Sequence, residues 1–330
     1  MSLPLSILDL APVPEGTSSS EALQNIVSLA RLGDELGYTR LWYAEHHGMP
    51  SIASSSPEVL IATAAANTSR IRVGSGGVML PNHVPLRVVE TYRTLNGLHP
   101  DRIDLGIGRA GGSDGRTLSA LRSTDGNDFP HELAEMLAFE QESFPLGHPY
   151  AQIRVVPEHV ALPPIFLLGS SGASAHAAGE LGVGYSFAAH FSPTPPRPAF
   201  DAYRAAFRPS PRMDKPHAIL ALSALLAPTD EEAAFLSTSQ ALSWALFHSG
   251  EVRKLLPPEQ ASAHVYTPQQ QAIVDKQSKL WIVGGPDNVK AEIERQAEAA
   301  GADEVMVTTT IWNHELRLRS YRLLAETFGL

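Results

Sequence analysis

Two imidazoles and a carboxylate stand together in Glu45-His46-His47, directly after the apolar run 40–44. That run reads as a strand, and α/β enzymes place their chemistry at the carboxyl ends of strands. A metal site is disfavoured, because adjacent histidines point opposite ways on a strand and no His-x-His or His-Glu-x-x-His spacing occurs. One histidine with an acid–base or hydrogen-bonding role fits better, although a buried structural histidine would leave the same pattern.

A second group of residues suits an anion. Gly169-Ser170-Ser171-Gly172-Ala173-Ser174 follows an apolar run and opens a helical pattern. Small residues let backbone N–H groups approach a phosphate, and a helix N-terminus favours negative charge. Arg109 lies just past another apolar run, among glycines that leave its guanidinium free to clamp a phosphate. Taken singly, the segment 169–174 also fits an ordinary capped turn, and Arg109 also fits a solvated surface arginine.

Three glycines in Gly74-Ser75-Gly76-Gly77-Val78-Met79 end a further apolar run. Glycines at a strand end leave room for a flat group against the backbone, and a β-bulge is the alternative. Four side chains are candidates for an apolar lining or for core positions, namely Met79, Phe187, Phe191 and Trp281.

Strand and helix patterns alternate along the whole chain, which predicts a (β/α)8 TIM barrel with an open doubly wound sheet as the alternative. The 330 residues are expected to form one domain, 1–330. The polar, proline-containing stretch 250–279 is expected to be a lid or a disordered loop inserted between strands seven and eight. The expected strands are 5–10, 40–44, a strand that opens at 71–74, 103–107, 164–168, 184–188, 217–227 and 304–309. The expected helices are 20–36, 57–68, 85–98, 131–144, 173–181, 195–207, 230–248, 289–300 and 313–328.

Composition narrows the class of partner. The formal charge is −10 without a basic stripe, which argues against nucleic acid. No apolar run approaches the ~20 residues that cross a bilayer, and no signal peptide is recognised, so we expect a cytoplasmic protein without a membrane partner. The absence of cysteine excludes disulfides, thiolate nucleophiles and cysteine-ligated metals.

The chain resembles the bacterial luciferase-like flavin monooxygenase family over nearly its whole length. The resemblance rests on segments that occur in the family's order: 42–47 (Trp-Tyr-Ala-Glu-His-His), 73–81 (Val-Gly-Ser-Gly-Gly-Val-Met-Leu-Pro), 83–90 (His-Val-Pro-Leu-Arg-Val-Val-Glu), 101–109 (Asp-Arg-Ile-Asp-Leu-Gly-Ile-Gly-Arg) and 168–171 (Leu-Gly-Ser-Ser).

This resemblance implies FMN at the carboxyl ends of the barrel strands. His46 would be the catalytic residue near the reacting edge of the flavin, and a non-proline cis peptide would lie at Gly76-Gly77. Some luciferases carry a cysteine where this chain has Gly108, so light emission is not implied. The implied cofactor-binding residues are Glu45, Gly76, Gly77, Val78, Arg109, Gly169, Ser170, Ser171, Gly172 and Ser174.

The resemblance also implies a reaction. Reduced FMN from a separate NAD(P)H:flavin reductase would react with O2 to a C4a-peroxyflavin that oxidises a small, apolar organic substrate. A deazaflavin (F420)-dependent hydride transfer, a flavin-binding protein without turnover and, disfavoured, a metal hydrolase are the alternatives. A homodimer is expected through helices that include 57–68.

Overall fold

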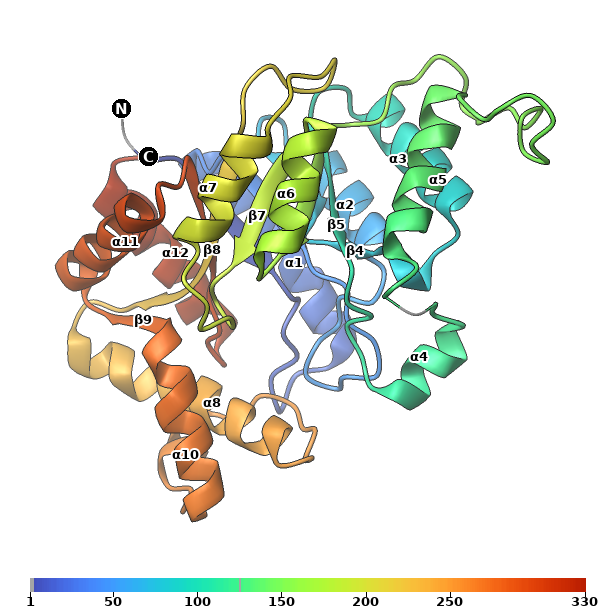
Figure 1. The fold of residues 1–330 in the computed structure, drawn as a ribbon. Coiled ribbons are helices and arrows are strands. Elements are labelled where there is room, and N and C mark those ends of the chain that lie inside the picture. Colours follow the sequence, from blue (N-terminus) through green and yellow to red (C-terminus); the bar gives the residue numbers. More distant parts are fainter. Residues whose placement is uncertain (1–2, 125) are drawn as a thin grey trace.

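The computed structural model describes residues 3–124 and 126–330, and its strands close into a parallel barrel (Figure 1). Strand β1 pairs with β2 on one side and with β10 on the other, and β10 pairs with β8, which closes the ring. The predicted (β/α)8 barrel is confirmed. Within the described residues the eight barrel strands are β1 (Leu5–Asp9), β2 (Arg40–Tyr43), β3 (Arg72–Ser75), β5 (Ile103–Gly108), β6 (Ile165–Gly169), β7 (Gly184–Ala188), β8 (Ala218–Leu226) and β10 (Glu304–Thr308).

Helices cover the outside of the barrel. The first shows how the local sequence sets their limits: Ser18 caps it in a reciprocal capping box with Glu21, and Gly37 ends it in the left-handed region with φ 88°. The helix was expected to begin at residue 20, and the capping box of Ser18 with Glu21 makes it begin at Ser19. No helix among the described residues combines the length and hydropathy that crossing a bilayer requires. Among the described residues, the helices outside the insertion are α1 (Ser19–Leu36), α2 (Pro57–Ala66), α3 (Pro85–Leu98), α4 (Gly115–Leu121), α5 (Phe129–Gln141), α6 (Gly172–Leu181), α7 (Arg197–Ala206), α8 (Asp230–His248), α11 (Pro286–Ala300) and α12 (His314–Phe328). Helix α4 has no buried residue and lies apart from the ring (Figure 1).

The inserted stretch 250–279 carries helices, in place of the disordered loop that was one of its two expected forms, and the lid stays a prediction. It contains α9 (Pro258–Ser262), α10 (Pro268–Gln277) and the short turn η2 (Ser278–Leu280), and it leads into a strand that was not predicted, β9 (Trp281–Gly284). Thr267 and Gln270 form a capping box that starts α10. Both helices lie beside α8 (Figure 1), where Leu242, Leu246 and Ala261 form a small apolar cluster.

Smaller elements were also missed. Asp114 caps α4 by accepting from two backbone N–H groups, and the two-residue strand β4 (Val78–Met79) pairs with β5. The turn η1 (Leu80–Asn82) follows β4. Helix α5 begins at Phe129 rather than 131, with a proline in its first turn. Together β4 and η1 fold the segment after the glycine-rich strand end back against the barrel.

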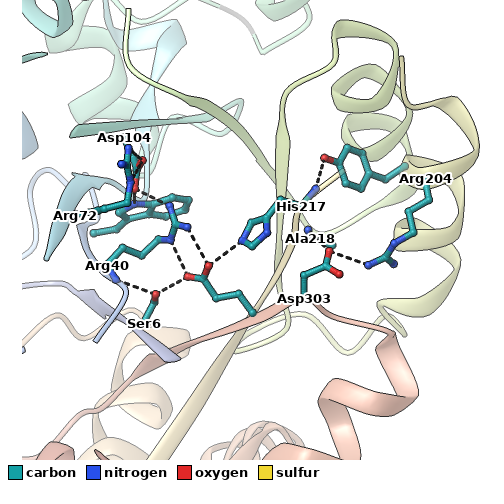
Figure 2. A network of polar contacts seen from close by, with 11 residues as sticks. Ser6, Arg40, Arg72, Asp104, Arg204, His217, Ala218 and Asp303 are labelled. Carbon is teal, nitrogen blue, oxygen red and sulfur yellow. Dashed lines mark hydrogen bonds and ion pairs between the residues drawn. The ribbon is translucent and has the colours of Figure 1, made fainter. Parts of the chain in front are cut away.

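The barrel interior has an apolar layer toward the carboxyl ends of the strands and a charged layer beneath it. Trp42, Phe166 and Met306 belong to the apolar layer. Below it, Arg40 donates to Glu304 at 2.7 Å and to Asp104 at 2.8 Å (Figure 2). The Trp42 indole N–H donates to Asp104 at 3.1 Å, so the two layers are directly linked.

The buried charges make part of the folding stability depend on pH. Burial by itself raises the pKa of Glu304, but Arg40 and His217 lower it to about 2 from an ordinary 4.5. A depressed pKa in the folded state contributes stability above the ordinary pKa and loses it as pH falls toward the folded value. The shift corresponds to on the order of 3 kcal/mol.

We therefore expect the difference in unfolding free energy between wild type and Glu304→Gln to be largest at neutral pH and to shrink as pH falls from about 5 toward 2. Urea denaturation at a series of pH values measures it. Glu294→Gln, at an exposed position of α11, serves as the control. A difference that stayed constant across this pH range would contradict the assignment.

Candidate functional site

A cavity of about 860 Å³ lies at the carboxyl ends of the barrel strands. Its floor is the apolar layer of the barrel, with Trp42, Leu168 and Met306 on three different strands. This volume lies within the range of small-molecule and cofactor sites. The floor can accept a flat apolar ring, and the loops after the strands supply the polar groups.

One end of the cavity has the properties of a phosphate site. Gly169, Ser170, Ser171 and Ser174 line it at the start of α6. The N-cap Ser171 makes no side-chain cap hydrogen bond, which leaves first-turn N–H groups of α6 open to an anion. A Cβ added at Gly169 would lie 1.9 Å from Ser174 Oγ, so glycine is what allows the serine to pack there. These donors fit the phosphate of a flavin nucleotide.

Arg109 adds a cation to the same cavity. It lines the cavity after β5 and is exposed, and its guanidinium has no ion-pair partner within the described part of the chain. Gly108 before it makes room for Met79, whose sulfur would lie 2.8 Å from an added Cβ. Gly172 is the first residue of α6 and is not part of the cavity lining.

The glycine pair lies where the barrel wall meets the cavity. The Gly76-Gly77 peptide bond is cis, as the resemblance implied, and Gly76 lines the cavity. A Cβ on Gly77 would lie 2.2 Å from Leu168 Cδ1, so this glycine permits close packing of two strand ends. Gly77 and Val78 do not line the cavity, and Val78 is buried against the barrel.

His46 faces the cavity and is held by the loop after β5. Its Nδ1 lies 3.0 Å from the Gly112 carbonyl oxygen. A carbonyl only accepts, so Nδ1 carries the proton, and the neutral ring presents an Nε2 lone pair. Burial lowers the pKa of His46, although the Gly112 carbonyl and Glu45 act in the opposite direction. The imidazole is therefore neutral at physiological pH.

Glu45 is buried and is not among the residues that line the cavity, so its predicted contact with the cofactor stays a prediction. Its buried carboxylate accepts from His83 at 2.9 Å, from His47 at 3.0 Å and from the Met79 N–H at 2.9 Å. Burial raises the pKa of Glu45, but hydrogen bonds from His83 and Asn82 bring it below its ordinary value. Glu45 thus ties the end of β2 to β4 and positions His46.

A second, smaller cavity of about 270 Å³ adjoins the first. Trp244 and Phe247 of α8, with Met49 and Ile52, give it apolar walls. The two cavities share Leu10, His46, His190 and Phe191. His46 therefore has access to ligands in either cavity.

The start of the insertion reaches this smaller cavity. Residues 251–253 and Leu255 line it, and Leu255 is held by backbone hydrogen bonds with Val13 and Glu15. Among the four apolar candidates, Met79 and Phe191 line a cavity, Phe187 is fully buried in the core, and Trp281 lines neither cavity.

The structure thus brings one subset of the predicted residues to a single cavity and reveals one residue that sequence reasoning missed. Those brought together are His46, Gly76, Arg109, Gly169, Ser170, Ser171 and Ser174, whereas Glu45, Gly77, Val78 and Gly172 lie outside the lining. The missed residue is His190, which follows β7 and lines both cavities. Its one sequence signal was its position just after a strand end.

Residues 3–304 match the family model for luciferase-like monooxygenases. The chain belongs to the luciferase-like monooxygenase family. It is 42% identical over 321 residues to the luciferase-like monooxygenase of Escherichia coli K12, covering 96% of this chain and 95% of the relative. It is 34% identical over 325 residues to the N-acetyl-S-alkylcysteine monooxygenase of Bacillus subtilis, covering 98% and 97%.

Solved structures agree with this luciferase-like monooxygenase fold. The structure of apo-MsnO8 is 41% identical, has a TM-score of 0.90, and covers 100% of this chain and 98% of that one. Two more distant structures match in fold alone. They are the oxygenating constituent of 3,6-diketocamphane monooxygenase from Pseudomonas putida with FMN (18% identity, TM-score 0.72, coverage 99% and 98%) and an F420-dependent secondary alcohol dehydrogenase (13%, 0.70, 99% and 99%).

Proposed function

We propose that the protein is an FMN-dependent monooxygenase that uses reduced flavin and O2 to oxidise a small, mainly apolar organic substrate. The observation that carries the proposal is one cavity with a phosphate-type turn at one end and His46 at the junction with a second cavity. The relative named as an N-acetyl-S-alkylcysteine monooxygenase supports this reaction class. Reduced FMN, when bound, supplies the electrons and activates O2.

Each end of the larger cavity has its own task in this proposal. Ser170, Ser171 and the open N-terminus of α6 bind the phosphate, together with Arg109. The apolar floor around Trp42 and Met306 holds the ring system and excludes water. His46, fixed by Gly112, accepts a hydrogen bond or a proton at Nε2.

The smaller cavity holds the organic substrate, and the segment 251–255 closes over it. Backbone bonds from Leu255 to residues 13 and 15 anchor one end of this lid. The rest of the insertion packs on α8 and supports the lid from outside. A separate NAD(P)H:flavin reductase would deliver the reduced flavin.

Hydride transfer with a deazaflavin is the second candidate, because an F420-dependent dehydrogenase shares the fold. The two candidates differ in whether O2 is consumed. Anaerobic titration with reduced FMN and, in parallel, with reduced F420, followed by admission of air, separates them. Tight binding of reduced FMN with O2 uptake supports the monooxygenase, binding of F420 alone supports hydride transfer, and binding of neither contradicts both.

The phosphate assignment gives a separate prediction. Arg109→Ala is expected to raise the Kd for FMN about tenfold, because a hydrogen bond to a charged group contributes about 1.5 kcal/mol or more. Riboflavin has no phosphate, so its affinity should not change. Flavin fluorescence titration measures both. Arg116→Ala, an exposed arginine on α4 outside the cavity lining, is the matched control. Equal losses of affinity for FMN and for riboflavin would mean that Arg109 contacts a part of the flavin other than its phosphate.

A further inference from the structure

Beside the phosphate-type turn, the larger cavity continues as a groove between helices α5 and α6. Helix α5 packs against α3 and helix α6 against α7, whereas α5 and α6 stand apart from each other (Figure 1). The cavity lining includes residues from 173 to 181 on α6 and from 129 to 141 on α5. At 1.5 Å per residue, each wall is more than about 10 Å long. The phosphate proposed for FMN uses only the start of α6, so most of this groove has no role in binding FMN.

The walls of the groove are apolar and are built from alanine and leucine. These residues follow one another at intervals of three or four, so each helix turns one face toward the groove. Alanine side chains are short and leave a flat slot, and a flat aromatic ring can cover both of its faces in such a slot. The wall residues are Leu133, Ala134, Leu137 and Ala138 on α5, and Ala173, Ala177 and Leu181 on α6.

Polar groups lie at the end of the groove that is remote from the phosphate-type turn. Gln141 and Ser143 continue the α5 wall, and Glu180 lies near the end of the α6 wall. All three residues are exposed. The Glu180 carboxylate lies 3.7 Å from His176 Nε2 and 3.7 Å from Arg208 Nη2, and both distances are longer than a hydrogen bond. The carboxylate therefore keeps lone pairs that can accept an N–H group of a ligand.

The charges along the lining limit what can extend beyond a flavin phosphate. Among the described residues that line the larger cavity, Arg109 is the one arginine or lysine and Glu180 the one carboxylate. A tail with several carboxylates, such as the oligoglutamate of F420, would place like charges near Glu180 without a cation to pair with them. A neutral, flat base with an amino group meets no such repulsion, and its ring suits the apolar slot.

We propose that the groove between α5 and α6 binds the adenosine end of FAD, so that the chain binds this flavin dinucleotide more tightly than FMN. The pyrophosphate of FAD would use Arg109 and the start of α6, the adenine ring would fill the slot between the alanines, and its amino group would donate to Glu180. This inference rests on the proposed flavin site and extends it from a mononucleotide to a dinucleotide. The isoalloxazine ring is the same in both cofactors, so the chemistry proposed beside His46 is unchanged.

Equilibrium dialysis of the flavin-free protein against FMN and, separately, against FAD measures the two affinities through the flavin absorbance. We expect FAD to bind about tenfold more tightly, because the adenine ring leaves water for the apolar slot. Ala177→Trp in the α6 wall and Ala134→Trp in the α5 wall each fill the slot with an indole. Both variants should lose the preference through weaker binding of FAD, with the affinity for FMN unchanged. Glu180→Leu should weaken FAD alone by about threefold.

Ala205→Trp, at an exposed position on α7 outside the cavity lining, is the matched control and should bind both flavins like wild type. Thermal unfolding of each variant checks that it is folded. If wild type binds FMN as tightly as FAD, or if the tryptophan variants in the groove weaken both flavins equally, the groove assignment is overturned and the FMN site remains. Binding of FAD without measurable binding of FMN supports the groove. Binding of neither flavin overturns the groove and the proposed function together.

Discussion

Replacing His46 by alanine is expected to shorten the interval between O2 uptake and H2O2 release in the FMN-loaded protein by about two orders of magnitude. His46 is the one imidazole from the Glu45-His46-His47 triplet that lines both cavities, and its Nδ1 is fixed on Gly112. In the proposed function, loss of Nε2 removes the group that would hold a proton where O2 reacts. Stopped-flow mixing of the reduced, FMN-loaded protein with O2, with a peroxide-coupled assay, measures the interval.

The affinity for FMN should change little in the same variant, because the residues proposed to bind the phosphate are other lining residues, Arg109, Ser170 and Ser171. His47→Ala is the matched control. Its ring pairs with Glu45 and lines neither cavity, so only a small effect is expected. An unchanged interval in His46→Ala, or a larger change in His47→Ala, would remove His46 from its proposed role.

The sequence was sufficient to predict the barrel, because each strand pattern was followed by a helical one and local capping signals bounded the helices. The capping box at Thr267 and Gln270 shows a signal that was present but not used. Had it been read, α10 would have been predicted inside the insertion. Strand β9 carried no such signal, because a strand of four residues is too short to show the alternation of apolar and polar side chains.

Residues of the candidate site could be predicted where a local sequence motif indicated them. They could not be predicted where the site depends on contacts between residues that are distant in the sequence. Gly169, Ser170 and Arg109 were found because their types suit a phosphate. The partners of Glu45 could not be predicted, because a single sequence does not show that His83 and Met79 fold back onto its carboxylate. His190 was missed for a related reason, since only the closed barrel places it at the junction with His46.

The charged layer beneath the cavity was invisible in the sequence, because Arg40 and Glu304 are 264 positions apart. We expect Arg40→Met to lower the free energy of unfolding by about 3 kcal/mol, since it removes a shared cation from two buried carboxylates and leaves Asp104 with Arg72 and Glu304 with His217. The guanidinium forms three hydrogen bonds, two to Glu304 and one to Asp104, and lies 5.1 Å from the centre of the Phe166 ring. Urea denaturation at neutral pH measures the loss.

Arg295→Met tests whether the large loss of stability expected for Arg40→Met is due to burial of the ion pair. Arg295 pairs with Glu292 at 2.6 Å on the surface of α11, and exposed pairs of this kind contribute less than about 1 kcal/mol. Combining Arg40→Met with Glu304→Leu should recover much of the loss, because both members of one buried pair are then apolar. A double variant no more stable than Arg40→Met would mean that Glu304, which keeps His217 as a partner, carries little of the penalty.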